Sequence, residues 1–261
     1  FILGGGTNIV FSDEGFDGFV LKPSLATIDI RGEEMHVGAG ALMKDVVASA
    51  AEAGLAGLEW AGGLPGTLGG AIRGNAGAFG GETKDNVGRV RSVDTKSRRF
   101  IERNASDCRF SYRTSVFKER GGGEAILSAV LSLKKGDKAA IREAVDAKIQ
   151  YRNDRHPMEY PNVGSIFKNV DARAMKKSDL EPFAHILKQD PFPVIPTAFL
   201  IAEAGLKGIS FGGAMISPKH PNFIVNILDA TASDVKTLID LVKKTVEDKF
   251  NIMLEEEVMY V

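Results

Sequence analysis

The sequence predicts an α+β protein, and three observations support this class. Runs with the alternation of short strands occur within residues 8–37 and 87–133, and three longer segments carry apolar residues at helical spacing. Of the 261 residues, 44% are hydrophobic, which is enough for a substantial core in one large or two moderate domains. We place the main boundary at residues 152–157, because the sequence Arg-Asn-Asp-Arg-His-Pro should interrupt a helix there.

The N-terminal half is predicted to consist of short strands around one helix. Residues 1–3 resemble the second half of a buried strand that leads into Gly4-Gly5-Gly6. Since a strand needs neighbours, we expect a preceding segment that this sequence does not contain. Residues 41–53 have the apolar spacing of a helix, with Gly54 as its C-terminal cap. Further strands are expected at residues 8–11, 18–21, 26–30, 34–37, 90–94, 99–102 and 125–133.

The C-terminal half is predicted to combine two long helices with a proline-rich connection. Residues 138–151 and 233–250 each carry one apolar stripe. Thr231 or Ser233 suits the start of the second of these helices, because both side chains can cap free backbone N–H groups. The remaining elements expected here are a short helix with a proline-fixed loop at residues 170–199 and a closing strand at residues 254–261.

Composition and charge exclude several classes of protein. The formal net charge of −1 provides no general field for nucleic acid or an anionic membrane. The one cysteine, Cys108, rules out an internal disulfide and suits a reducing compartment. No signal peptide or membrane-length apolar stretch is recognisable, so we expect a cytoplasmic protein. The four histidines lack metal-ligand spacing, and no metal site is expected.

The stretch with the most unusual composition is residues 62–82, which contains nine of the 29 glycines. Glycine costs roughly 0.5–1 kcal/mol relative to alanine inside a helix or strand, so we expect neither element here. Successive backbone N–H groups in glycine-rich turns form concave sites for anions such as a diphosphate. The alternative is a run of tight turns or a flexible linker. A linker would be rich in serine, whereas this stretch contains Leu64, Leu68, Ile72 and Phe79, which favours an ordered ligand loop.

Three further places carry residues suited to chemistry: Tyr112-Arg113-Thr114-Ser115, residues 162–169, and the carboxylate run Glu255-Glu256-Glu257. Each also has an ordinary explanation, because arginines, turn serines and glutamates are common on protein surfaces. Two other classes of site are excluded. The sequence contains neither a Gly-Lys-Ser/Thr phosphate loop nor a dinucleotide fingerprint, and the residues around Ser165 do not form the nucleophile elbow of a serine hydrolase.

Seven motifs occur in an order that resembles the UDP-N-acetylenolpyruvoylglucosamine reductase family, also called UDP-N-acetylmuramate dehydrogenase. Together they cover essentially the whole chain, and their order makes the resemblance specific although each motif alone is weak. The motifs are Gly4-Gly5-Gly6-Thr7-Asn8, Gly63-Leu64-Pro65-Gly66-Thr67-Leu68-Gly69-Gly70-Ala71, Asn75-Ala76-Gly77-Ala78-Phe79-Gly80, Tyr112-Arg113-Thr114-Ser115-Val116-Phe117, Gly164-Ser165-Ile166-Phe167-Lys168-Asn169, Ala204-Gly205-Leu206-Lys207-Gly208 and Leu254-Glu255-Glu256-Glu257-Val258.

The resemblance implies a flavoprotein of two domains. An FAD-binding domain of the vanillyl-alcohol-oxidase type would occupy residues 1–150, without its N-terminal strand–helix–strand unit. A C-terminal α+β substrate-binding domain would occupy residues 151–250, and residues 251–261 would return to the active site as a closing strand. In this family NADPH reduces FAD, which then reduces the enolpyruvyl ether of UDP-N-acetylglucosamine to UDP-N-acetylmuramate for peptidoglycan.

The resemblance also implies where FAD binds. Because no histidine or cysteine occurs in residues 1–35 or 37–107, we expect FAD to be bound non-covalently. The triple-glycine turn and the glycine-rich stretch should surround its diphosphate. The expected cofactor-binding residues are Gly4, Gly5, Gly6, Thr7, Asn8, Leu64, Pro65, Gly66, Thr67, Gly69, Gly70, Asn75, Ala76, Gly77, Ala78 and Tyr112.

The same resemblance assigns the catalytic residues. Hydride addition to the terminal carbon of the enolpyruvyl group leaves negative charge beside a carboxylate, so the site must stabilise that charge and then deliver a proton. Arg113 matches the family's arginine, whose planar fork suits a carboxylate. Glu257 matches the assisting carboxyl group, and Ser165 matches the general acid that protonates the second carbon. Substrate contacts are expected from Arg155, Lys168, Asn169 and His220.

Two features set this chain apart within the resemblance. The short separation of Arg113 and Ser165 is similar to the subtype that lacks an added loop over the substrate diphosphate. Residues 170–199 look longer than the usual link, without an evident mechanistic role. Two alternatives stay open: an FAD-dependent sugar or alcohol oxidase on the same fold, and a catalytically silent nucleotide-sugar-binding fragment. NADPH consumption that depends on the enolpyruvyl substrate would distinguish the reductase from the oxidase, and binding of UDP-N-acetylglucosamine derivatives without retained flavin would favour the silent fragment.

Overall fold

The computed structural model describes all residues from 1 to 261, and the packing divides them into two compact units. The first unit comprises residues 1–6 and 18–152, and the second comprises residues 7–17 and 153–261. The domains 1–150, 151–250 and 251–261 rest on the family resemblance, and their boundaries stay a prediction. The packing adds that residues 7–17 belong with the C-terminal part of the chain.

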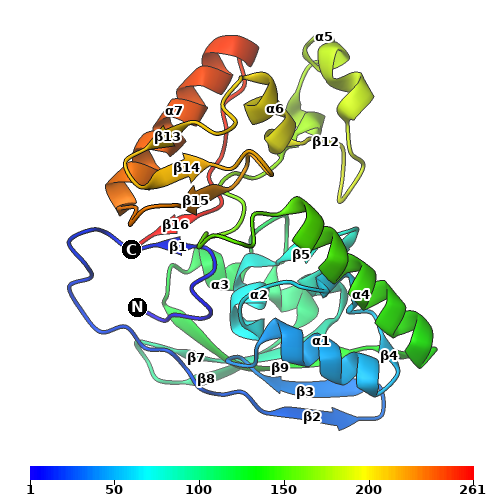
Figure 1. The fold of residues 1–261 in the computed structure, drawn as a ribbon. Helices are drawn as coiled ribbons and strands as arrows, with labels where there is room; N and C mark the ends of the chain where they lie inside the picture. Colours follow the sequence, from blue (N-terminus) through cyan, green and yellow to red (C-terminus); the bar gives the residue numbers. More distant parts are fainter. The chain divides into compact units, whose positions relative to one another are not determined.

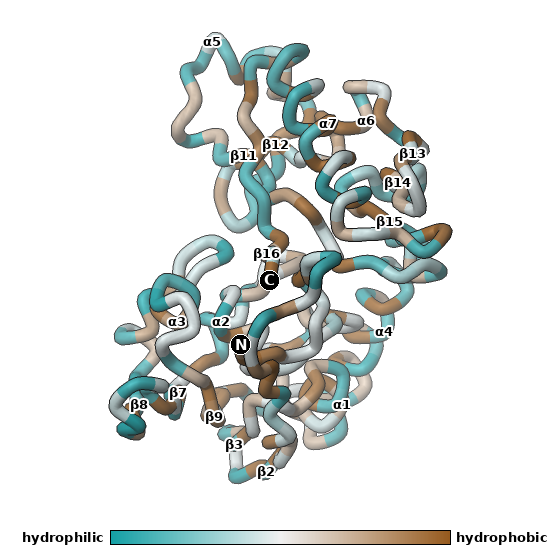
Figure 2. Tube along the Cα trace, turned by 90° about the vertical axis from the view of Figure 1, so that its left-hand side faces the viewer, coloured by the Kyte–Doolittle hydropathy of each residue, from teal (hydrophilic) through white to brown (hydrophobic).

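The first unit is organised around a five-stranded antiparallel sheet in the order β2–β3–β9–β7–β8, which is seen in Figure 1. In β3 the side chains alternate, so that Met35 and Val37 are buried and Glu34 is exposed. Figure 2 shows hydrophobic residues along β9, the central strand. The strands are β2 (Ile28–Arg31), β3 (Glu34–Gly38), β7 (Val87–Asp94), β8 (Phe100–Asn104) and β9 (Glu124–Ser132).

Helices cover one face of this sheet, as Figures 1 and 2 both show. The predicted helix at residues 41–53 is confirmed as α1 (Met43–Glu52), which buries Met43, Val46, Val47, Ala50 and Ala51. Gly54 follows it with φ +65°, as expected of a residue after a helix end. The remaining elements of this unit are β4 (Leu55–Ala56), α2 (Leu68–Gly74), β5 (Gly77–Ala78), β6 (Gly81–Glu82), α3 (Val116–Glu119) and β10 (Lys134–Lys135), followed by α4 (Lys138–Arg155), which ends in the second unit.

The prediction that residues 62–82 contain no regular element is wrong, because α2 lies within them. Thr67 accepts a hydrogen bond from the Gly70 N–H at the start of α2, and Asn75 ends the helix with φ +43°. The helix buries Leu68, Ala71 and Ile72. A Cβ atom on Gly69 would lie only 3.0 Å from the Ala39 Cβ, so glycine permits this close packing. The buried apolar surface offsets the entropic cost of the glycines.

Three further expectations need correction. α4 continues to Arg155, since the first proline after it is Pro157, and only there is the chain forced out of the helix. Residues 18–21 form no strand, because Phe19 is 86% exposed and the segment is paired by an isolated bridge from Ile2 to Leu21 and a hydrogen bond from the Phe1 ammonium to the Phe19 carbonyl oxygen. The closing strand is limited to β16 (Met259–Tyr260), since the preceding residues pair with another segment.

The second unit has its own core beneath the last helix, α7 (Ala232–Phe250). This helix confirms the prediction, with Thr231 at its N-cap and Asp234 completing a capping box. It packs on a three-stranded sheet and buries Leu238, Ile239, Val242 and Val246. The other elements are β1 (Ile9–Val10), β11 (Val170–Asp171), α5 (Lys177–Leu180), β12 (Val194–Ile195), α6 (Thr197–Glu203), β13 (Ser210–Phe211), β14 (Ala214–Ile216) and β15 (Ile224–Asn226). None of the chain's helices combines the length and apolar character needed to cross a membrane.

Asp13 fastens residues 7–17 to the start of α7. Its carboxylate accepts hydrogen bonds from the Ser233 hydroxyl at 2.6 Å and from the Ala232 and Ser233 N–H groups at 2.6 and 3.0 Å. The Ser233 hydroxyl and then these N–H groups lower the pKa of Asp13 below its usual value.

We expect Asp13→Asn to unfold at lower urea concentration than the wild-type protein at pH 7, because an amide cannot accept all three bonds. The lowered pKa of Asp13 means that the wild-type advantage is complete above the unfolded-state pKa of about 3.9 and disappears as the pH falls through the folded-state value. Urea unfolding at several pH values measures this difference. Asp17→Asn, an exposed carboxylate of the same segment, is the control and should change little. An Asp13→Asn deficit that is independent of pH would contradict the expectation.

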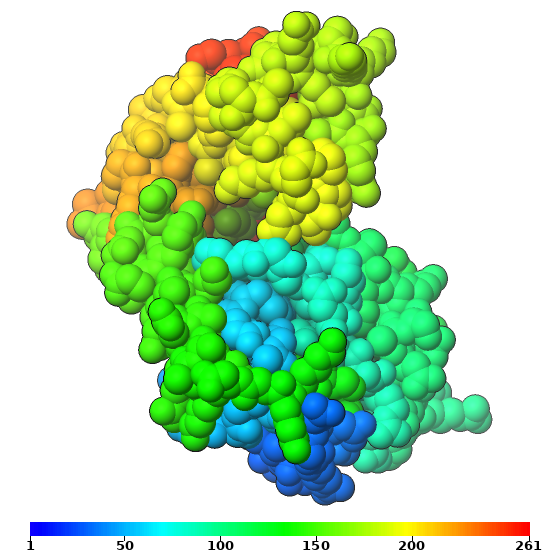
Figure 3. Space-filling model, turned by 90° about the vertical axis from the view of Figure 1, so that its right-hand side faces the viewer, coloured from blue at the N-terminus to red at the C-terminus, as the bar shows by residue number.

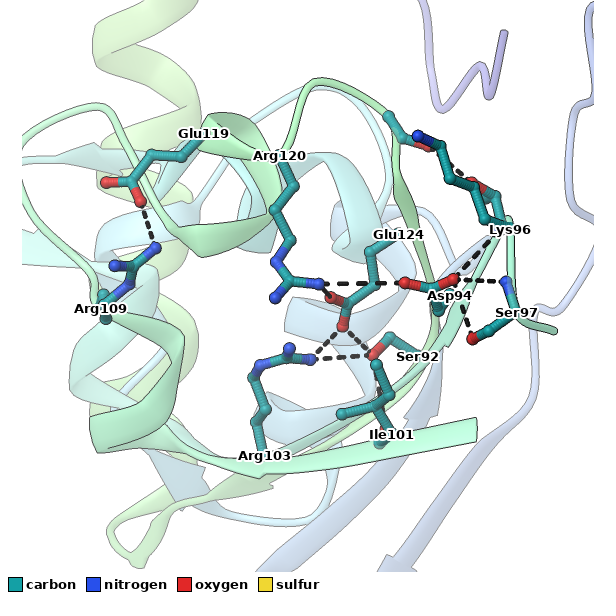
Figure 4. Close-up of polar contacts among 12 residues, drawn as sticks. Ser92, Asp94, Lys96, Ser97, Ile101, Arg103, Arg109, Glu119, Arg120 and Glu124 are labelled. Atoms are coloured by element: carbon teal, nitrogen blue, oxygen red, sulfur yellow. Dashed lines mark hydrogen bonds and ion pairs between the residues drawn. The ribbon is translucent and has the colours of Figure 1, made fainter. Parts of the chain in front are cut away.

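A buried polar network joins β7, β8 and β9 at one end of the large sheet (Figure 4). The Glu124 side chain is fully buried and accepts short hydrogen bonds from the Ser92 hydroxyl and the Arg103 guanidinium. Arg120 lies 3.4 Å from the other carboxylate oxygen of Glu124. Arg103 is itself only 12% exposed, so its charge depends on Glu124. The network fixes the start of β9, directly after the loop that follows α3.

Candidate active site

In the first unit, the triple glycine packs against the glycine-rich stretch, backbone to backbone. A Cβ atom on Gly5 would lie 2.6 Å from the Gly66 Cα, and one on Gly4 would lie 2.8 Å from the Thr67 Oγ1. No other residue type fits at Gly5 without movement of the backbone. The structure thus brings together two segments that the sequence assigned to the same ligand.

Several backbone N–H groups in these two segments donate no hydrogen bond within the protein. They belong to Gly4, Gly5, Gly6, Gly66 and Thr67. Unpaired N–H groups on adjoining turns are the donors that an anionic diphosphate requires. The residues present therefore fit the diphosphate of FAD.

The end of the glycine-rich stretch is fixed by Asn75, whose side chain is fully buried. Its Nδ2 donates to the Ser111 carbonyl oxygen at 2.9 Å and to the Glu82 carboxylate at 3.3 Å, and its Oδ1 accepts from the Lys84 N–H at 3.0 Å. Both polar atoms of the Asn75 side chain therefore bond to groups within the protein. These bonds shape the turn at residues 75–84, and contact of Asn75 with the cofactor stays a prediction.

Arg113 lies beside this turn in an unusual backbone conformation, with φ +56°. Its Nη2 donates to the Gly77 carbonyl oxygen at 2.8 Å, and its guanidinium carbon lies 5.0 Å from the centre of the Tyr112 ring. Lys118 of α3 donates to the Arg113 carbonyl oxygen at 2.9 Å. A planar cationic fork is therefore held at the end of the glycine-rich stretch in the first unit.

In the second unit, the structure brings Ser165 and Glu257 into neighbouring, backbone-paired segments. The Glu257 N–H donates to the Ile166 carbonyl oxygen at 2.8 Å, and the Lys168 N–H donates to the Glu255 carbonyl oxygen at 2.9 Å. Ser165 follows Gly164, which has φ +79°, and precedes two fully buried residues. The predicted proton donor and the predicted carboxyl group thus share one small framework.

Asn222, which no sequence pattern marked, holds this framework. Its Nδ2 donates to the Phe167 carbonyl oxygen at 2.8 Å, and its Oδ1 accepts from the Phe167 N–H at 3.0 Å. The Ile166 N–H donates to the Asn222 carbonyl oxygen at 2.8 Å. The buried Asn222 side chain thereby satisfies both backbone groups of Phe167, as a neighbouring strand would. Asn8, predicted to bind the cofactor, donates through Nδ2 to the Glu257 carbonyl oxygen at 3.0 Å.

The three consecutive glutamates have different surroundings. The exposed Glu255 pairs with the Lys168 ammonium, and Glu256 pairs with Lys243 of α7 at 2.8 Å. Burial and then the hydrogen bond to Glu256 raise the pKa of Tyr260 well above its usual value. Glu257 is the member of the run whose main chain pairs beside Ser165. The catalytic role of Glu257 stays a prediction, and the Lys168 ammonium has a carboxylate partner.

The other predicted substrate residues are dispersed within the second unit. Asn169 accepts a hydrogen bond from the Thr197 N–H at 3.2 Å, and Arg155 is exposed at the end of α4. The His220 ring packs 4.8 Å from the centre of the Phe223 ring, and its Nδ1 is buried without a hydrogen-bond partner. Burial lowers the pKa of His220 to about 4, so this imidazole is neutral at pH 7. Substrate contact by these residues stays a prediction.

The fold and the sequence both match known proteins. Residues 1–99 match the FAD binding domain family, and residues 156–261 match the C-terminal domain of UDP-N-acetylenolpyruvoylglucosamine reductase. The reductase of Exiguobacterium sibiricum is 38% identical over 258 residues, which are 98% of this chain and 77% of that protein. The Lactobacillus acidophilus reductase is 37% identical over 258 residues, or 98% of this chain and 78% of the relative.

A solved structure agrees with these sequence relatives. The crystal structure of the Thermus caldophilus reductase superposes with a TM-score of 0.78 and 30% identity, covering 100% of this chain and 85% of that chain. The predicted α+β fold class is confirmed, and the fold and site define an FAD-dependent oxidoreductase. The chain belongs to the UDP-N-acetylenolpyruvoylglucosamine reductase family.

Proposed function

We propose that this chain uses NADPH to reduce the enolpyruvyl ether of UDP-N-acetylglucosamine, giving UDP-N-acetylmuramate for peptidoglycan synthesis. Family membership and the match to an FAD binding domain support this reaction. The single observation that carries it is the backbone pairing of the segment after Ser165 with Glu257. This pairing joins the main chains that carry a hydroxyl group and a carboxyl group, the two kinds of group proposed to assist protonation of carbon.

FAD, when bound, accepts hydride from NADPH and transfers it to the substrate. The residues that would hold it are the glycines at 4–6 and residues 66–67, whose N–H groups suit a diphosphate. Arg113 would orient the substrate carboxylate and stabilise the negative charge that hydride addition leaves beside it. Ser165 would supply the proton to that carbon, and Glu257 would assist at the same step.

The first test is the visible absorption spectrum of the purified chain after incubation with FAD and removal of free cofactor. We expect a retained flavin spectrum that shifts when the UDP-sugar substrate is added. NADPH consumption should then match UDP-N-acetylmuramate formation one to one and stop without the enolpyruvyl substrate. A folded protein that retains no flavin would refute the proposal. NADPH-independent oxidation of sugars with consumption of oxygen would instead support an oxidase.

A further inference from the structure

Arg152 of α4 is a buried charged residue that contacts two separated parts of the glycine-rich stretch. Its Nε donates to the Gly62 carbonyl oxygen at 2.9 Å, and a Cβ atom on Gly63 would lie 2.9 Å from its Cδ. Its guanidinium carbon also lies 5.1 Å from the centre of the Phe79 ring. In Figure 3 the green atoms of α4 border the cyan atoms of this stretch.

Several residues of α4 contact the Phe79 ring. The Lys148 ammonium lies 4.9 Å from its ring centre, and the Tyr151 ring meets it edge-on at 5.2 Å. Phe79 itself has φ +52°, a conformation that a bulky side chain rarely adopts. Contacts outside the loop must therefore stabilise this backbone. Lys148 and Arg152 both lie beside Phe79 and the beginning of the stretch, and Arg152 also donates a hydrogen bond to the Gly62 carbonyl oxygen.

Fold stability does not account for an arginine at this position. Arg152 is only 9% exposed, and its Nη2 is buried without a hydrogen-bond partner. Burial lowers the pKa of this guanidinium from its usual value, which reflects the cost of removing the charge from water. An apolar side chain of similar length would avoid that desolvation cost. The charge and the Nε bond thus point to a task other than core packing.

We propose that Arg152 is a positioning residue that holds Gly62, Gly63 and Phe79 in the arrangement that the FAD site requires. It acts through the loop backbone. The inference rests on the proposed FAD-dependent function. It assigns to α4, which the sequence marks only as an amphipathic helix, control over the shape of the cofactor loop.

The test compares FAD affinity with fold stability in Arg152→Met and in the control Arg142→Met, an exposed arginine of the same helix. Flavin fluorescence titration measures the Kd for FAD, and urea unfolding without FAD measures stability. Loss of a hydrogen bond to a charged donor should raise the Kd of Arg152→Met at least about tenfold. Its urea midpoint should equal or exceed that of the wild-type protein, and Arg142→Met should change neither quantity.

The outcomes separate this inference from the proposed function. If the wild-type chain does not bind FAD, the proposed function fails and the inference fails with it. If the wild-type chain binds FAD and Arg152→Met binds it equally well, only the inference is overturned. Parallel losses of affinity and stability would reduce Arg152 to a structural residue. Combining Arg152→Met with Phe79→Leu should raise the Kd by less than the product of the two single effects, since both residues shape one loop.

Discussion

Ser165→Ala should slow oxidation of the reduced enzyme by the UDP-sugar substrate about 10²–10⁴-fold, the usual contribution of a positioned general acid. Reduction of the bound FAD by NADPH should remain nearly unchanged, because no proton reaches a carbon atom in that half of the reaction. The surrounding fold should persist, since Gly164 and the buried pair Ile166 and Phe167 fix the backbone without the hydroxyl group. Stopped-flow absorbance of the flavin measures the two half-reactions separately.

The control for this experiment is Ser210→Ala, an exposed serine of β13 in the same unit, which should leave both rates unchanged. Equal losses in both half-reactions of Ser165→Ala would refute the proton-donor role and indicate a disturbed cofactor site instead. A normal rate in the oxidative half-reaction would move the proton donor elsewhere. In that case Glu257, which pairs beside Ser165 through the backbone, would be the next residue to replace.

Local patterns allowed much of the fold to be predicted. The apolar stripes of α1 and α7 and the capping threonine at residue 231 are determined within a few neighbouring residues, so the sequence reveals them directly. α2 could not be predicted in this way, because its glycines disfavour a helix unless tertiary packing compensates. The compensation includes close packing against Ala39, which directly follows β3 and is far away in the sequence. Tertiary contact therefore overrode the local propensity of this segment.

The residues of the candidate site also fall into two groups, those that a local sequence motif marks and those that only tertiary contacts reveal. Ser165, Glu257 and Arg113 carry chemistry that recurring motifs mark, and they could be named from the sequence. Asn222 and Arg152 could not, because each acts by bonding to a backbone group distant in the sequence. An asparagine after a proline and an arginine at a helix end have no distinctive local pattern. Positioning residues of this kind become recognisable only when burial and hydrogen bonds are known.

Glu124→Ala should destabilise the first unit by about 3–5 kcal/mol, the usual cost of breaking a buried ion pair from one side. The substitution leaves the nearly buried Arg103 guanidinium without its carboxylate and the Ser92 hydroxyl without its acceptor. Arg120 loses a partner as well, but it is 46% exposed and can be solvated. Urea unfolding followed by far-ultraviolet circular dichroism measures the difference in free energy of unfolding.

The double variant Glu124→Leu with Arg103→Met separates the cost of an unpaired charge from the value of the network. Removing both charges should restore most of the lost stability, since apolar replacement of a complete buried pair is often neutral. If the double variant is instead as unstable as Glu124→Ala, then the position of the start of β9, and not the unpaired charge, limits stability. A Glu124→Ala protein as stable as the wild type would show that water reaches Arg103 and that the network does not contribute to stability.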